Sequence, residues 1–141
     1  MRTRSPLALL AALALALASA GCRRPAGPDA AYRAFAAAAR AGDSGRVWEL
    51  LSEGSRAALD ARAKALAARV PGLPASGREQ ALGDLAAGAP RIVDVAVKNE
   101  SGDSALLAVT AEGVDRTQEV RMVREGGRWR VVLPEAILPP P

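Results

Sequence analysis

The spacing of apolar residues changes once along the chain, near Arg91. Before this point apolar side chains recur every three or four residues, and after it they alternate with polar ones. The first spacing is typical of helices with one buried face, and the second of strands with one buried face. The sequence therefore predicts a helical half followed by a half made of strands.

The first predicted helix begins near residue 29 and ends at Gly42. Asp29 is placed to cap its N-terminus. Apolar residues then recur at i, i+3, i+4 and i+7, which is the spacing of one helix face. This stripe, which we expect to face the core, consists of Tyr32, Phe35, Ala36 and Ala39.

Three further helices are predicted before residue 88. Asp43 or Ser44 caps the second helix, the third runs from about residue 55 to 70, and a short fourth covers residues 76–87. Pro71 ends the third helix because the residue before a proline is restricted away from helical conformation. The inward residues are Val47, Leu50 and Leu51 in the second helix, Leu59, Ala63, Leu66 and Val70 in the third, and Leu82 and Leu85 in the fourth.

Four strands are predicted after Arg91, joined by short links at residues 100–103, 112–115 and 125–127. Such links suit antiparallel hairpins. Residues 105–110 are apolar on both faces, which places that strand centrally in the sheet. The inward residues are Val93, Val95 and Val97 in the first strand, Val120 and Met122 in the third, and Trp129, Val131 and Leu133 in the fourth.

This order of elements predicts an α+β domain. Helices that precede a meander of strands are expected to pack on one face of the antiparallel sheet. We therefore predict N-terminal helices on one face of a curved four-stranded antiparallel meander. The domain covers residues 29–133, and a proline-rich, extended tail follows at residues 134–141.

The first 22 residues have the pattern of an export signal. Arg2 and Arg4 precede an apolar run at residues 7–18, and small residues stand directly before Cys22. A transmembrane helix needs roughly twenty apolar residues, so this run is too short to be one. The pattern predicts a signal peptide at residues 1–21.

Residues Ala18-Ser19-Ala20-Gly21-Cys22 resemble the lipobox of bacterial lipoproteins. The resemblance implies that a signal peptidase cuts before Cys22 and that the thiol carries a lipid with acyl chains such as palmitate. Residues 22–28 then form a lipidated linker. Arg23 is similar to the residue found in lipoproteins on the periplasmic face of the outer membrane of Gram-negative cells. The alternative is an ordinary secreted protein with Cys22 near its cleavage site.

The composition excludes several kinds of chemistry. The chain has no His and a single Cys, so it has no imidazole base, disulfide or thiolate cluster of its own. Loss of Arg2 and Arg4 with the signal lowers the net charge from +4 to +2, and the remaining basic residues are scattered. We therefore predict no metal, no cofactor and no nucleic-acid partner.

Polar residues on the predicted strands are candidates for a site. Asp94 and Lys98 lie opposite the valines of the first strand, beside Glu119. If this face is in water, the charges form surface ion pairs, and if the sheet encloses a cavity, they form a polar floor. The candidate pocket or sheet-face polar residues are Tyr32, Asp94, Arg121 and Arg130.

Two further patterns have simpler interpretations. The aromatic residues Tyr32, Phe35, Trp48 and Trp129 either line a pocket or form the core. The segment Gly42-Asp43-Ser44-Gly45 resembles the loop around the nucleophile of trypsin-type serine proteases, but the chain has no His to take the serine proton. Its position between two helices predicts a helix stop followed by an N-cap.

Several segments together resemble small lipoproteins of the nuclear transport factor 2-like superfamily, over about residues 29–133. They are Tyr32-Arg33-Ala34-Phe35, Gly42-Asp43 and the closing hairpin at residues 123–131. The resemblance implies a cone of helices and curved sheet that often encloses a pocket. Members include binding domains, dimerisation modules, ketosteroid-isomerase-like enzymes and polyketide cyclases, and no stretch of this chain matches the motif of the isomerase-like enzymes.

These patterns predict a lipid-anchored, non-catalytic binding or interaction module of the bacterial envelope. Its partner is another envelope protein or a small apolar molecule. One alternative is an enzyme of the isomerase or cyclase type that uses Tyr32 or Asp94. Another is a homodimer formed through an apolar patch on the sheet, which would consist of Ile92, Ala96, Leu106, Ala108 and Val132.

Overall fold

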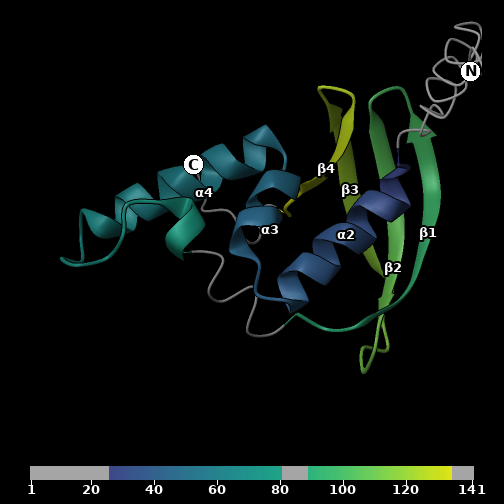
Figure 1. Cartoon of the computed structure of the whole chain (residues 1–141), viewed down its shortest axis with the longest axis horizontal. Coiled ribbons are helices and arrows are strands. Elements are labelled where there is room, and N and C mark those ends of the chain that lie inside the picture. The colour runs from purple at the N-terminus through teal and green to yellow at the C-terminus, as the bar shows by residue number, and fades with distance from the viewer. Residues whose placement is uncertain (1–25, 81–88, 135–141) are drawn as a thin grey trace, which may run out of the picture.

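The computed structural model describes residues 26–80 and 89–134 and confirms the α+β class (Figure 1). The four strands form one open antiparallel sheet in the order β1-β2-β3-β4, joined as a meander. The elements are α2 (Pro28–Arg40), α3 (Ser44–Leu50), α4 (Glu53–Ala67), β1 (Ile92–Ser101), β2 (Ser104–Ala111), β3 (Gln118–Glu125) and β4 (Arg128–Val132).

Some predictions fall outside the described residues. These are the signal peptide, Cys22, Leu82 and Leu85 of the fourth helix, and the tail after Pro134. Residues 77–80 are helical, at the start of the predicted fourth helix. Within the described ranges, no helix has the length and apolar character needed to cross a bilayer.

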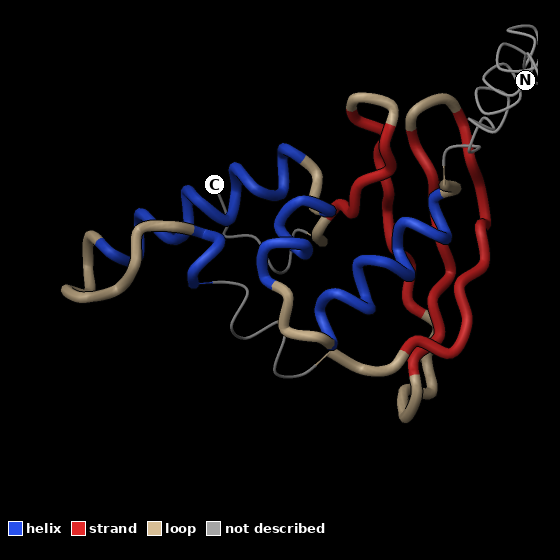
Figure 2. The backbone as a smooth tube through the Cα atoms, viewed as in Figure 1, coloured by secondary structure: helices blue, strands red, loops and turns tan. Residues whose placement is uncertain are grey.

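Of the helices that the structure describes, α2 is the one that covers the inner face of the sheet. It contacts β1, β2 and β4, whereas α3 packs against α2 and the edge strand β4. Helix α4 extends away from the sheet beyond β4 (Figure 2). The described helices therefore share the sheet unevenly, because α2 lies over its inner face whereas α3 and the start of α4 reach it at β4.

The helix boundaries follow from their caps, and the prediction that Asp29 caps the first helix was wrong. Gly27 is the N-cap of α2, and Pro28 takes the first helical position, where its missing N–H costs no hydrogen bond. Asp29 lies in the first turn instead, where its negative charge interacts favourably with the helix dipole. Of the two candidates for α3, Asp43 is the cap, because its Oδ1 accepts a hydrogen bond from the Arg46 N–H at 2.9 Å.

Helix α4 begins and ends earlier than its apolar stripe predicts. Ser52 caps it, since the Ser52 Oγ accepts from the Ser55 N–H at 3.2 Å, and the helix ends at Ala67. Val70, predicted to face inward, is 47% exposed. The stripe predicted the buried positions Leu59 and Ala63 correctly but not where the helix stops.

Strand β2 is hydrogen bonded on both sides, which confirms its predicted central place. Its residues alternate between a buried inner face and a partly exposed outer face. Hairpin β3–β4 turns through Gly126 and Gly127, whose φ angles of 57° and 75° are both positive. A two-residue turn of this kind needs positive φ at both positions, and glycine adopts it without a steric penalty.

Strand β1 departs from strict alternation. Its pairing with β2 shifts between Ile92 and Asp94, so Val93 is an extra residue and is 62% exposed. Ile92 pairs with Ala111 and lies on the inner face. The predicted inward position of Val93 was wrong because a bulge reverses the alternation on one side of it.

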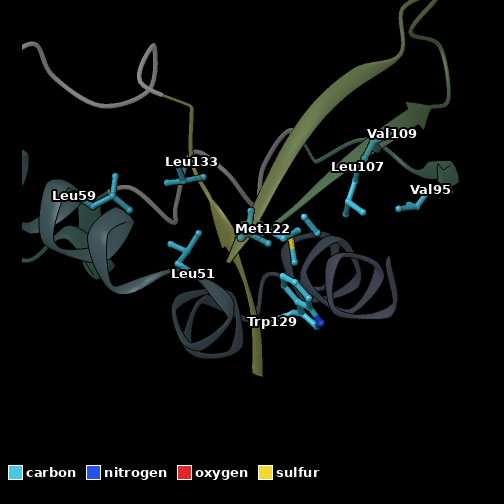
Figure 3. Packing of buried hydrophobic residues seen from close by; sticks show 10 residues of the cluster. Leu51, Leu59, Val95, Leu107, Val109, Met122, Trp129 and Leu133 are labelled. Atoms are coloured by element: carbon cyan, nitrogen blue, oxygen red, sulfur yellow. The ribbon is translucent and has the colours of Figure 1, made fainter. Parts of the chain in front are cut away.

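The core lies between the sheet and the helices. Figure 3 shows its labelled side chains, of which Leu51 and Leu59 come from the helical half and the others from the strands or the residue after β4. Leu51 and Leu107 are fully buried, and Trp129 is 6% exposed. Trp129 is therefore a core residue, whereas Trp48 is partly buried against the core. The aromatic residues are thus divided between the core and its margin.

A polar seam attaches the start of α4 to β4. The Leu133 N–H donates to the buried Ser55 Oγ at 2.9 Å, and the Ser52 Oγ donates to the same atom at 2.8 Å. The Glu53 N–H donates to both carboxylate oxygens of Glu125, at 3.1 and 3.0 Å. Leu51 forms a bridge with Val131, which completes the seam.

Ser55→Ala is expected to lower the free energy of unfolding by about 1–3 kcal/mol, because the buried Leu133 N–H loses its acceptor. Urea unfolding followed by tryptophan fluorescence measures this change. Ser44→Ala is the control, since Ser44 is exposed at the start of α3, and it is expected to change stability by less than about 0.5 kcal/mol. Equal effects of the two substitutions would contradict the seam.

Candidate functional site

A pocket of about 580 Å³ lies between α2 and the inner face of the sheet. It is at the end of the sheet where β1 and β3 begin and where β2 and β4 end. Its volume is within the range of about 300–1,000 Å³ typical of small-molecule sites. The apolar residues that border it are Tyr32, Phe35, Ala36, Ala39, Ala89, Pro90, Ile92, Val109, Ala111, Val120, Val131, Val132, Leu133 and Pro134.

Helix α2 forms one wall with the stripe predicted from the sequence. The rings of Tyr32 and Phe35 lie with centroids 6.0 Å apart and a tilt of 30°. Ala36 and Ala39 follow on the same face, and their small side chains leave space between the helix and the sheet. The stripe is therefore partly a pocket wall as well as a packing surface.

The opposite wall comes from the inner face of all four strands. Val109, Val120 and Val131 belong to β2, β3 and β4, and Ile92 reaches the pocket from β1. The bulge at Val93 is what turns Ile92 inward. Without it, an isoleucine at this position would lie on the outer face of the sheet.

Tyr32 brings a hydroxyl into this apolar wall. Burial raises the pKa of the Tyr32 hydroxyl above its ordinary value, because the phenolate loses hydration there. The hydroxyl therefore stays protonated at physiological pH. Within the described part of the chain, its oxygen has no hydrogen-bond partner, so it is available to a ligand.

The candidate residue Arg121 borders the pocket but lies on β3 with its side chain on the far face. It pairs with Leu106 and Val132, and all three lie on the outer face, opposite Val120. Glu119 shares that face, where its Oε1 is 2.7 Å from the Lys98 Nζ. Both partners are half exposed, so they form a surface ion pair across β2.

The other two candidates lie away from the pocket wall. Asp94 is 67% exposed at its side chain and is 3.8 Å from the Arg33 guanidinium. Arg130 donates from Nη1 to the Glu49 carbonyl oxygen at the end of α3. The structure thus brings Tyr32 and the backbone of Arg121 to the pocket, and it separates them from Asp94 and Arg130.

The outer face of the sheet is not covered by any helix that the structure describes (Figure 1). Of the patch predicted there, Leu106, Ala108 and Val132 are half-buried and Ala96 is exposed. Ile92 does not belong to it, because the β1 bulge turns this residue toward the pocket. The patch is therefore smaller than predicted and is crossed by the Lys98–Glu119 ion pair.

Several wall residues were not found from the sequence. Ala89 and Pro90 precede β1 and Pro134 follows β4, so no repeating pattern marks them as a group. Leu133, which also follows β4, was predicted to face inward. The available signal was positional, since antiparallel strands bring the start of β1 and the end of β4 to one end of the sheet.

Comparison with known proteins gives no match to any protein family, curated protein or solved structure. What the site can do is therefore argued from its geometry. It combines apolar walls, a half-open volume of a size suited to a small molecule and one available hydroxyl. Such a combination is typical of ligand-binding sites.

Proposed function

We propose that this protein is a lipid-anchored module of the bacterial envelope that binds a small apolar molecule beneath α2. The single observation that carries the binding proposal is the pocket of about 580 Å³ with apolar walls. An apolar ligand would remove this surface from water, and each square ångström of apolar surface so buried contributes roughly 25 cal/mol. A concave site of this size suits a small apolar molecule better than the surface of another protein.

We also propose that the domain is of the nuclear transport factor 2-like kind. What supports this is the order of helices before a meander, together with a pocket between the first helix and the inner sheet face. The enzyme alternative has less support, because Asp94 is exposed, pairs with Arg33 and does not line the pocket. A dimer formed through the sheet face is supported only by the apolar patch on the outer face, which is smaller than predicted.

Native mass spectrometry of the purified chain tests the binding proposal. We expect an extra mass that is lost on denaturation, and Ala36→Leu is expected to reduce it, because the larger side chain takes up part of the pocket. Ala37→Leu is the matched control, since Ala37 lies on the exposed face of the same helix. Full retention of the bound mass by both variants would contradict the pocket as its site. A bare monomer would favour a protein partner, and a bare dimer the sheet face.

The proposed anchor is tested at Cys22, which we expect to carry the acyl chains. Cys22→Ala is expected to remove labelling by palmitate and to shift the protein from the membrane fraction to the soluble fraction. The reason is that each buried methylene of an acyl chain contributes about 0.8 kcal/mol to membrane binding. Arg24→Ala serves as the control and should stay in the membrane fraction. A Cys22→Ala variant that remains acylated would overturn the proposal.

A further inference from the structure

The charged residues that border the pocket point away from it. Glu119 and Arg121 alternate with Val120 on β3, and Val120 is on the inner face, so their side chains belong to the outer face. Glu119 is held there by Lys98 at 2.7 Å. The described pocket wall therefore supplies no counter-charge to a bound ion.

The two polar residues that line the pocket from the inner faces of α2 and β3, Tyr32 and Gln118, are uncharged. Tyr32 lies on the α2 stripe among apolar residues. Gln118 pairs with Val109 at the start of β3 and is exposed, so it lies at the rim. Tyr32 is thus the polar group of the inner wall, and Gln118 is the polar group of the entrance.

From this arrangement we infer that the pocket selects an uncharged molecule that carries a hydrogen-bond acceptor, which the Tyr32 hydroxyl binds. The inference rests on the proposed function, since it names the class of ligand for the same site. A buried carboxylate, phosphate or ammonium would lose its hydration without gaining a partner, which is strongly unfavourable. A carbonyl, ether or hydroxyl oxygen has a smaller hydration to lose and gains the Tyr32 O–H as donor.

The raised pKa of Tyr32 agrees with this role. Because the hydroxyl keeps its proton, it can donate a hydrogen bond to an acceptor. It also carries no negative charge that would repel the lone pairs of that acceptor. An anionic ligand would also meet no cation in the described wall, as the Arg33 guanidinium is near Asp94 and Arg121 is on the outer face.

Three naphthalenes of similar shape test the inference: 2-acetylnaphthalene, 2-ethylnaphthalene and 2-naphthoate. Their binding is measured by displacement of the neutral fluorescent ketone prodan from the full chain with Cys22→Ser, so that no acyl chain competes. Prodan binding that the Ala36→Leu variant weakens is assigned to the pocket, because this variant narrows it. We expect the acetyl compound to bind roughly fivefold more tightly than the ethyl compound. We expect 2-naphthoate to bind at least tenfold more weakly than the acetyl compound.

Two variants separate the contributions of the side chains. Tyr32→Phe keeps the ring, so it is expected to remove the preference for acetyl over ethyl and to leave ethyl binding unchanged. Arg121→Gln is the control, and it should change none of the three affinities, because its side chain is on the outer face.

Equal binding of the three compounds would overturn the inference while leaving the pocket as a binding site. The same holds if Tyr32→Phe keeps the preference for acetyl, or if Arg121→Gln selectively weakens binding of 2-naphthoate. Absence of pocket-dependent prodan binding, together with no bound mass in native mass spectrometry, would overturn both the inference and the proposed function.

Discussion

Leu107→Ala is expected to lower the free energy of unfolding by about 2–5 kcal/mol, which is a large share of the stability of a small domain. Leu107 is fully buried on the central strand β2, where it pairs with Val97 on one side and Val120 on the other. Shortening it leaves a cavity that the sheet cannot close, because β2 is held by hydrogen bonds to a strand on each side. Urea unfolding followed by tryptophan fluorescence gives the change.

The neighbouring residue Leu106 is the matched control. It has the same side chain on the same strand, but it is half-buried on the outer face. Leu106→Ala is expected to cost about 1 kcal/mol or less. A slip of the sheet by one residue would exchange the two faces, so a larger effect at Leu106 than at Leu107 would contradict the register of β2.

The α2 stripe shows how much of the site could be predicted from the sequence. The spacing of Tyr32, Phe35, Ala36 and Ala39 predicted a helix and its inward face, and these residues line the pocket. The pattern alone could not distinguish a packed core from a pocket. That distinction depends on how far the helix lies from the sheet, which the small side chains and the opposite wall decide together.

Strand β1 shows where local pattern fails. Three alternating valines predicted one inner face, but a bulge at Val93 places Ile92 inward in its stead. A bulge depends on how two strands pair, and a single strand carries no sign of it. The same bulge places Ile92 in the pocket and not in the predicted outer patch. One extra residue, Val93, therefore changes both predicted surfaces.

The seam at β4 was also outside the reach of periodicity. Ser55 was predicted as the start of a helix, and in the structure it is the buried acceptor for the Leu133 N–H. These two residues are 78 positions apart in the chain. A small polar residue can satisfy such a backbone group only where the fold brings it, so its role appears once the elements are assembled.

Gly77→Ala is expected to lower the free energy of unfolding by about 3 kcal/mol. An added Cβ would lie 2.5 Å from the Leu59 carbonyl carbon and 2.6 Å from the Asp60 nitrogen, both backbone atoms of α4. Backbone atoms within a helix cannot turn aside as a side chain can. The two segments must therefore move apart, which also strains the 2.8 Å hydrogen bond from the Gly77 N–H to the Asp60 Oδ1.

The sign of this prediction is opposite to the usual effect of the substitution. Gly77 begins a helical segment, and replacing glycine by alanine in a helix ordinarily stabilises it by up to about 1 kcal/mol. Gly54 in α4 gives the matched comparison, because its added Cβ would meet no atom within 4 Å. Gly54→Ala is therefore expected to raise stability by up to about 1 kcal/mol in the same urea unfolding measurement. If Gly77→Ala also raised stability, the close approach of residues 77–80 to α4 would be refuted. The gain in helix propensity would then explain the effect at both glycines, with no steric clash at Gly77.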